Sequence, residues 1–252
     1  MLERTYLHLP GVGPATERSL WAHGLTDWAA ALGCDGPVPG ISRRRWDQCR
    51  RCLDDSVRSL DALDHRFFAP ILPSAEHWRA YQAFRGRVGF VDIETTGMGP
   101  YAQVTVVGVF DGVRTSSYIA GDNLDQFAEH AAELSMLVTF NGASFDLPYL
   151  RRAFPGLQWN HLHCDLRFAL RRLGLSGGLK AIERRLGICR DGEIDGLSGD
   201  DAVRLWQEYC AGSEESLARL VAYNAADVEN LLILMDYVYE RLQAGLFEEM
   251  RL

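Results

Sequence analysis

Lysine is almost missing from this chain, which has one lysine and 25 arginines among its 252 residues. We attribute that bias to the base composition of the genome and infer no function from it. Long apolar runs are missing too: the longest, Val104 to Phe110, is far too short to cross a membrane. The first residues include an early acid and no extended apolar region, so we expect no secretory signal, no membrane partner and a cytoplasmic location.

A disulfide framework is also missing, because the six cysteines are scattered and the chain is too large to need one. Cys49 and Cys52 form a CxxC in a charged, helix-like stretch. A zinc site would need a second pair of ligands, and the only remote candidates are His161, His163 and Cys164. We therefore favour structural or solvated cysteines over a metal site.

Basic residues are fewer than acidic ones, and the net charge is −8. Residues 1–87 carry +2, whereas residues 88–252 carry −10. An acidic domain can still bind a polyanion if bound divalent cations invert the local charge. The balance therefore does not exclude nucleic acid as a partner.

The segment from Leu9 to Pro14 has the pattern apolar-x-Gly-apolar-Gly and resembles the hairpin of a helix-hairpin-helix motif. Gly11 and Gly13 permit a tight turn at a helix N-terminus, where backbone N–H groups can bind a phosphate. The basic residue that usually follows such a hairpin is absent, and Glu17 stands nearby. A nucleic-acid contact and a purely structural turn both stay open.

Composition and turn signals divide the chain into three parts. We expect a helix-hairpin-helix-like helical region at 1–60, a linker with a helix near 76–84 within 61–87, and one domain at 88–252. In that domain, apolar runs and the Asp111-Gly112 turn predict strands near 88–93, 103–110, 114–119, 136–140 and 161–164, with helices at 123–134 and 147–154 and further helices to the end. This order predicts an α/β fold: a mixed sheet flanked by helices, with a small helical N-terminal domain.

Two carboxylates stand at the end of the first of these strands. Asp92 and Glu94 are two residues apart, so in a strand they project from the same face. Such close carboxylates repel each other unless a cation lies between them, and their hard oxygen atoms suit Mg²⁺ or Mn²⁺.

Asn224 and Asp227 interrupt an otherwise apolar stripe of the last long helix, formed by Leu220, Leu231, Leu234 and Val238. A carboxylate on a core face is costly unless it is paired or bound to metal. No lysine or arginine stands three or four residues away, so we expect Asp227 to lack a basic partner and to bind metal. Asp146 stands at a helix start, and taken alone it is better explained by its favourable interaction with the helix dipole.

Together these segments resemble the DEDD 3′–5′ exonucleases of the RNase H-like superfamily over about residues 88–242. Asp92 and Glu94 match the first family motif, Asp146 the second and Asp227 the third, while Tyr223 stands where the tyrosine-type enzymes place their water-orienting residue. Phe90 to Gly97, Asn141 to Leu150, Gly177 to Lys180 and Tyr223 to Asn230 look like the YprB-like branch.

The resemblance implies two-metal hydrolysis of nucleic-acid phosphodiesters at single strands or 3′ ends, with Mg²⁺ or Mn²⁺ as cofactor and a helicase as a partner. It favours DNA over RNA and a role in DNA repair. Asp92, Glu94, Asp146 and Asp227 are the expected metal ligands, and Tyr223 aligns the attacking water. Lys180 either contacts a substrate phosphate or starts a helix in solvent.

Two other functions stay open. An RNase H-fold endonuclease would use similar acids to cut internally, although Tyr223 favours the exonuclease. A non-catalytic nucleic-acid-binding module would rely on the N-terminal hairpin, although the intact set of four acids speaks against it.

Overall fold

A computed structural model describes residues 1–38, 40–190, 192 and 196–250. The chain divides into two compact units. Unit 1 contains Met1–Arg85, Asn160–His163 and Tyr239–Leu252, and unit 2 contains Gly86–Trp159 and Cys164–Val238.

The sheet has five strands in the order β3-β2-β1-β4-β5, and it belongs to unit 2 except for the start of β5. β1 pairs antiparallel with β2, β2 pairs antiparallel with β3, and β1 pairs parallel with β4. The central β1 is thus flanked on both sides, as its apolar sequence predicts. The strands are β1 (Val88–Thr95), β2 (Val104–Phe110), β3 (Thr115–Ile119), β4 (Met136–Thr139) and β5 (Leu162–Asp165).

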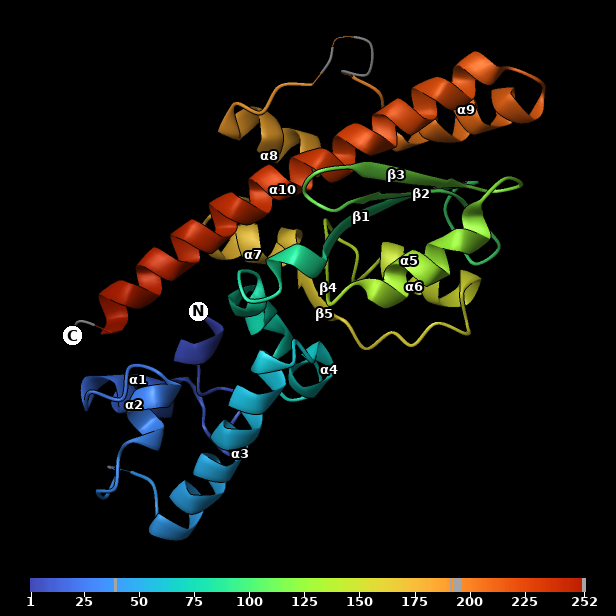
Figure 1. The fold of residues 1–252 in the computed structure, drawn as a ribbon. Coiled ribbons are helices and arrows are strands. Elements are labelled where there is room, and N and C mark those ends of the chain that lie inside the picture. The colour runs from blue at the N-terminus through green and yellow to red at the C-terminus, as the bar shows by residue number, and fades with distance from the viewer. Residues whose placement is uncertain (39, 191, 193–195, 251–252) are drawn as a thin grey trace. The chain divides into compact units, whose positions relative to one another are not determined.

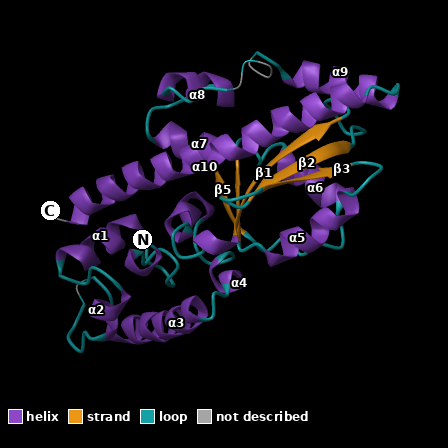
Figure 2. Ribbon diagram, turned by 45° about the horizontal axis from the view of Figure 1, so that its top comes forward, coloured by secondary structure: helices purple, strands orange, loops and turns teal. Residues whose placement is uncertain are grey.

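Helices cover both faces of this sheet (Figures 1 and 2). On one face, Val91, Ile93, Val107 and Val109 pack in a core with α5 (Phe127–Glu133) and α6 (Asp146–Ala153), which follow the short η4 (Leu124–Gln126). On the other face, Val106 packs with α9 (Gly199–Cys210) and with the start of α10 (Glu214–Met250). The shorter α7 (Leu166–Arg172) and α8 (Leu179–Leu186) precede α9. The predicted fold, a mixed sheet flanked by helices, is confirmed.

Unit 1 is built from short helices around aromatic side chains. They are η1 (Leu2–Arg4), α1 (Pro14–Ala22), α2 (Trp28–Leu32), α3 (Arg43–Asp61), α4 (His65–Phe68), η2 (Ser74–Ala80) and the start of η3 (Arg85–Arg87). Trp28 stacks on Phe68 with ring centroids 6.0 Å apart. The helical N-terminal region is therefore present as predicted.

The helix expected near 76–84 is instead a 3₁₀ helix at Ser74–Ala80. Glu76 accepts hydrogen bonds from Trp78 and from Arg79, three residues on, at 3.1 and 2.7 Å. Side chains three residues apart eclipse one another in a 3₁₀ helix. Arg79 is in turn held by the buried carboxylate of Glu17 at 3.1 Å. This ion pair explains why an acid follows the N-terminal hairpin.

Candidate metal centre

β1 presents Asp92 and Glu94 on the face of the sheet that α9 and α10 cover. Their register partners on β2 are Gly108 and Val106, and Val106 packs against those two helices. The two carboxylates therefore point out of the sheet toward α10, as the two-residue spacing predicts.

α10 brings Asp227 to the same place because its apolar stripe lies against the sheet. Leu220, Leu231, Leu234 and Val238 are all buried, and so is Asp227. A Cβ on Gly108 would lie 2.1 Å from Oδ1 of Asn224, so the missing side chain allows α10 to approach β2 closely.

Asn224 connects the helix to the strand, since its Nδ2 donates a hydrogen bond of 2.9 Å to Oδ2 of Asp92. The stripe thus contains one polar side chain that binds an acid and one that is itself an acid.

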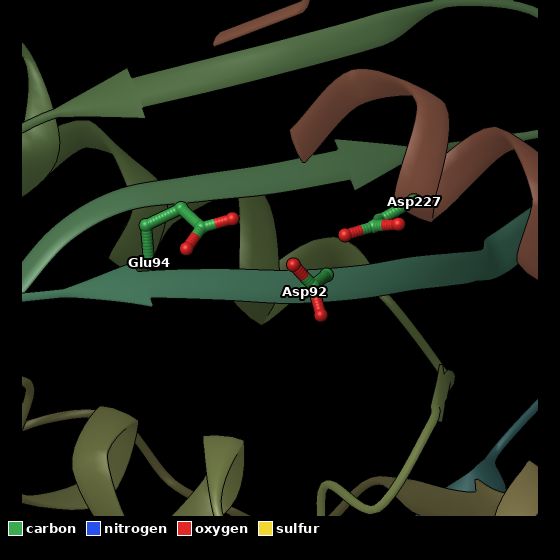
Figure 3. A group of neighbouring side chains, drawn as sticks. All are labelled: Asp92, Glu94 and Asp227. Atoms are coloured by element: carbon green, nitrogen blue, oxygen red, sulfur yellow. The ribbon is translucent and has the colours of Figure 1, made fainter. Parts of the chain in front are cut away.

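Asp92, Glu94 and Asp227 converge on one point (Figure 3). One carboxylate oxygen of each lies within 4.8 Å of those of the other two. Burial, followed by repulsion from Asp227 and Asp146, raises the pKa of Asp92 well above its ordinary value and that of Glu94 to about 8. Burial also raises the pKa of Asp227. Three desolvated carboxylates this close together repel one another and fit a divalent cation held by oxygen ligands.

Asp146, the first residue of α6, is buried beside this cluster but is not one of the three grouped acids. Its pKa is raised to about 7, chiefly by burial, with the charges of Asp165 and Asp227 adding to the shift. Asp165 caps α7 and accepts hydrogen bonds from the backbone N–H groups of Asn141 at 2.8 Å and Ala143 at 3.0 Å. Asp165 therefore caps α7, and it also fixes the turn that leads into α6.

A family model described as RNase_H superfamily matches residues 89–239, well over half of the chain. The chain belongs to the RNase H superfamily. Comparison with curated proteins and with solved structures finds no match. An RNase H-like domain with a buried cluster of acids fits a metal-dependent nuclease with nucleic acid as its substrate. Among the described residues, no helix is long and apolar enough to cross a membrane.

Tyr223 and Lys180 both border the acids of the RNase H-like domain. Tyr223 lines the same cleft as Asp92 and Asp227, and burial, with the charge of Asp227, raises its pKa. Nζ of Lys180 lies 4.4 Å from the centroid of the Tyr223 ring, a cation–π contact. Lys180 therefore faces the acid site and is not a solvated residue at a helix start.

The expectation that Asp227 lacks a basic partner is wrong. Arg190 contacts Oδ1 of Asp227 through Nη2. Its guanidinium also donates two hydrogen bonds to Glu183, at 2.7 and 2.8 Å. Asn230 donates a third hydrogen bond to Glu183, of 3.0 Å. No helical spacing signals this pairing, because Arg190 is 37 positions away in the chain. The buried Glu183, an acid on the core face of an amphipathic helix, was the only local sign of a hidden cation.

The N-terminal hairpin belongs to unit 1 and contributes no side chain to the acid cluster. Gly11 has a left-handed φ of +67°, and Gly13 is the N-cap of α1. Arg45 donates hydrogen bonds to the carbonyl oxygens of Pro10, at 3.3 Å, and of Gly11. Cys49 and Cys52 are free thiols within α3.

Proposed function

We propose that this chain is a tyrosine-type, two-metal 3′–5′ exonuclease that hydrolyses nucleic-acid phosphodiesters, with DNA favoured over RNA. The observation that carries the proposal is the convergence of Asp92, Glu94 and Asp227 within 4.8 Å, with Tyr223 one turn before Asp227 on α10. Residues 88–252 are the catalytic domain in this proposal, and 61–87 link it to the helical region at 1–60.

Each site residue has a distinct role in this proposal. Asp92 would contact both cations, Glu94 and Asp227 would complete the ligands of one, and Asp146 would hold the other. Bound cations lower the pKa of the attacking water and stabilise the leaving oxygen. The hydroxyl group of Tyr223 orients the water toward phosphorus as the bond from phosphorus to the 3′ oxygen breaks. The products are a nucleoside 5′-monophosphate and a strand one nucleotide shorter.

The experiment is a digestion of end-labelled single- and double-stranded DNA and RNA with Mg²⁺ or Mn²⁺. We expect mononucleotides released from the 3′ end and a loss of at least about 100-fold in rate for Asp92→Asn, as is typical when transition-state charge stabilisation is removed. Asp125→Asn, at an exposed position on the same domain, is the matched control. Internal fragments would identify an endonuclease, and metal-independent binding without cleavage would identify a binding module.

The N-terminal hairpin is a second, separate contact in this proposal. Backbone N–H groups at Gly11 and Gly13 would bind a phosphate at the start of α1, and Arg45 adds the positive charge that the hairpin sequence lacks. A role in DNA repair and a helicase partner stay predictions of the resemblance.

A further inference from the structure

A cleft of about 770 Å³ in unit 2 has two chemically different walls. Asp92, Asp227 and Tyr223 form one wall, beside Glu94. Lys180, Arg184 and Arg190, from α8 and the segment that follows it, form the other. The acidic and basic residues line one space of the size that ligands occupy, and the two sets meet where Arg190 contacts Asp227 and Lys180 lies over the Tyr223 ring.

The basic wall belongs to the most positive part of an otherwise acidic domain. Residues 166–190 contain seven lysines and arginines and one acid, whereas residues 88–252 as a whole carry a net charge of −10. Half of the basic residues of the domain thus lie in this short span, next to the acids. Such a local reversal of sign attracts a polyanion to one side of the site.

Two of the three cations have N–H groups without an acceptor. Nζ of Lys180 and Nη1 of Arg190 are buried and have no hydrogen-bond partner among the described residues. Glu183 holds the opposite edge of the Arg190 guanidinium, which fixes its position. Buried donors of this kind are costly unless an acceptor arrives.

Arg184 is the accessible member of the wall. It is four residues after Lys180, so both side chains lie on one face of α8. Ile182 is buried, and Glu183 is also buried but lines the same cleft and binds Arg190. Arg184 is exposed, and so is its neighbour Arg185, which does not line the cleft. Adjacent arginines therefore face different surroundings.

We propose that Lys180, Arg184 and Arg190 form a phosphate-binding wall for the substrate strand. Arg184 contacts the backbone phosphate next to the hydrolysed bond, and Lys180 and Arg190 act closer to the acids. The partner is one strand of nucleic acid, bound through its phosphates and without base specificity. This inference rests on the proposed function, because it assumes that the reacting phosphodiester lies at Asp92 and Asp227.

The test compares Arg184→Gln with Arg185→Gln, both made in an Asp92→Asn chain so that bound strands stay intact. Fluorescence anisotropy measures the Kd of fluorescein-labelled single-stranded DNA, and of the matching RNA, in Mg²⁺ at several salt concentrations. For Arg184→Gln we expect Kd to rise about fivefold and the slope of log Kd against log salt to fall by about 0.7, the loss of one phosphate contact. For Arg185→Gln we expect a Kd within about twofold of the parent.

Equal losses in the two variants, no loss with Arg184→Gln, or no binding of either strand by the Asp92→Asn chain would overturn the phosphate-binding wall. Failure of the proposed function looks different. In that case the chain with an intact Asp92 shows no Asp92-dependent cleavage, while the contrast between Arg184→Gln and Arg185→Gln in Kd persists.

Discussion

Gly108 has no side chain, and the position of α10 against the sheet depends on that. A Cβ at this position would lie against Oδ1 of Asn224 and a methyl group of Val228. Asn224 in turn donates a hydrogen bond to Asp92. The absence of a side chain at position 108 therefore affects the positions of the acids.

We therefore expect Gly108→Ala to destabilise the protein by about 1–3 kcal/mol, the usual cost of overpacking, and to weaken divalent-cation affinity by moving Asn224. Urea unfolding and calorimetric titration with Mn²⁺ measure the two effects. Gly156→Ala is the control, because a Cβ there meets nothing within 4 Å, and it should stay within about 0.5 kcal/mol of the parent. A Gly108→Ala chain as stable as the parent would contradict this account.

Glu183 is buried against the guanidinium of Arg190. Its replacement leaves a buried cation with Asp227 as its remaining acidic partner. We expect Glu183→Ala to cost about 3–5 kcal/mol in the free energy of unfolding, toward the lower end because Asp227 compensates. Asp55→Ala breaks the exposed pair with Arg58 and should cost at most about 1 kcal/mol. Similar urea midpoints for the two variants would show that the Glu183 pair does not stabilise the fold.

Individual site residues were predictable to different degrees. Asp92 and Glu94 follow from strand periodicity, and Asp227 from the helix stripe that it interrupts. The roles of Arg190 and Asn224 at the site could not be predicted from such patterns. Arg190 meets Asp227 only through tertiary structure. Asn224 can be recognised as the partner of Asp92 only when the strand pairing is known, because that pairing places Gly108 beside Asp92 and leaves room for Asn224.

At the scale of elements, the turn from β4 into α6 depends on one capping carboxylate. Asp165 accepts hydrogen bonds from the N–H groups of Asn141, Ala143 and Arg167. Asn141 has a left-handed φ of +67°, a conformation that asparagine tolerates better than most other non-glycine residues. The same turn delivers Asp146 to the site.

Asp165→Ala leaves three backbone donors without an acceptor. We expect it to cost about 1–3 kcal/mol and to reduce cleavage, because the turn before Asp146 loosens. Asp165→Asn, which keeps one acceptor oxygen, should be intermediate in both unfolding free energy and rate. If Asp165→Ala lost stability but kept the full cleavage rate, the turn would not position Asp146 for catalysis.

Element boundaries were predicted best where turn signals bound an apolar run. The five strands begin and end within about two residues of the predicted ones, because β1, β2 and β4 are short apolar runs that are buried almost throughout. The 3₁₀ helix at Ser74–Ala80 was not predictable as such, because it depends on the contact between Arg79 and Glu17, residues 62 positions apart.

At the scale of the whole molecule, we expect the acid cluster to make stability depend on divalent cations. A ligand that binds only the folded state adds about 2.7 kcal/mol when its concentration is 100 times its Kd. We expect Mg²⁺ or Mn²⁺ to raise Tm in the parent and in Asp125→Asn. Asp92→Asn should melt higher than the parent without metal, because one repelling charge is gone, and should respond little to metal. Differential scanning fluorimetry at constant ionic strength measures this, and an equal response in Asp92→Asn would place the cation elsewhere.

Unit 1 has its own dependence on pH. The hydroxyl group of Ser56 donates a hydrogen bond to the backbone carbonyl oxygen of Cys52. Nε2 of the buried His8, 2.9 Å from Oγ of Ser56, is therefore the donor in the contact between His8 and Ser56. Burial lowers the pKa of His8 from 6.5 to about 3, so below pH 6.5 the unfolded chain takes up a proton that the folded chain does not. The contribution of His8 to stability is therefore complete above pH 6.5 and is lost as the pH falls.

Between pH 7 and pH 5 this linkage should remove about 2 kcal/mol. Urea unfolding at both pH values measures the loss. The loss of unfolding free energy between the two pH values should be about 2 kcal/mol smaller in His8→Gln than in the parent. In His23→Gln, which replaces an exposed histidine, it should equal that of the parent. Equal losses in the parent and His8→Gln would contradict the buried neutral imidazole.

The composition of the two units could not be read from the linear order of the chain. Residues 160–163 and the end of α10 belong to unit 1, although they follow or interrupt segments of the sheet domain. Periodicity identifies elements, whereas the assignment of elements to units depends on long-range packing that no local pattern encodes.

Lys180 is the only lysine of the chain, so its side chain is the one primary amine besides the N-terminus. Reductive methylation with ¹³C-formaldehyde therefore labels the interior of the sequence at a single atom. That atom lies over the Tyr223 ring, 4.4 Å from its centroid, where ring currents shift a methyl resonance upfield. One NMR line can thus follow cation and strand binding beside the acids without any engineered label.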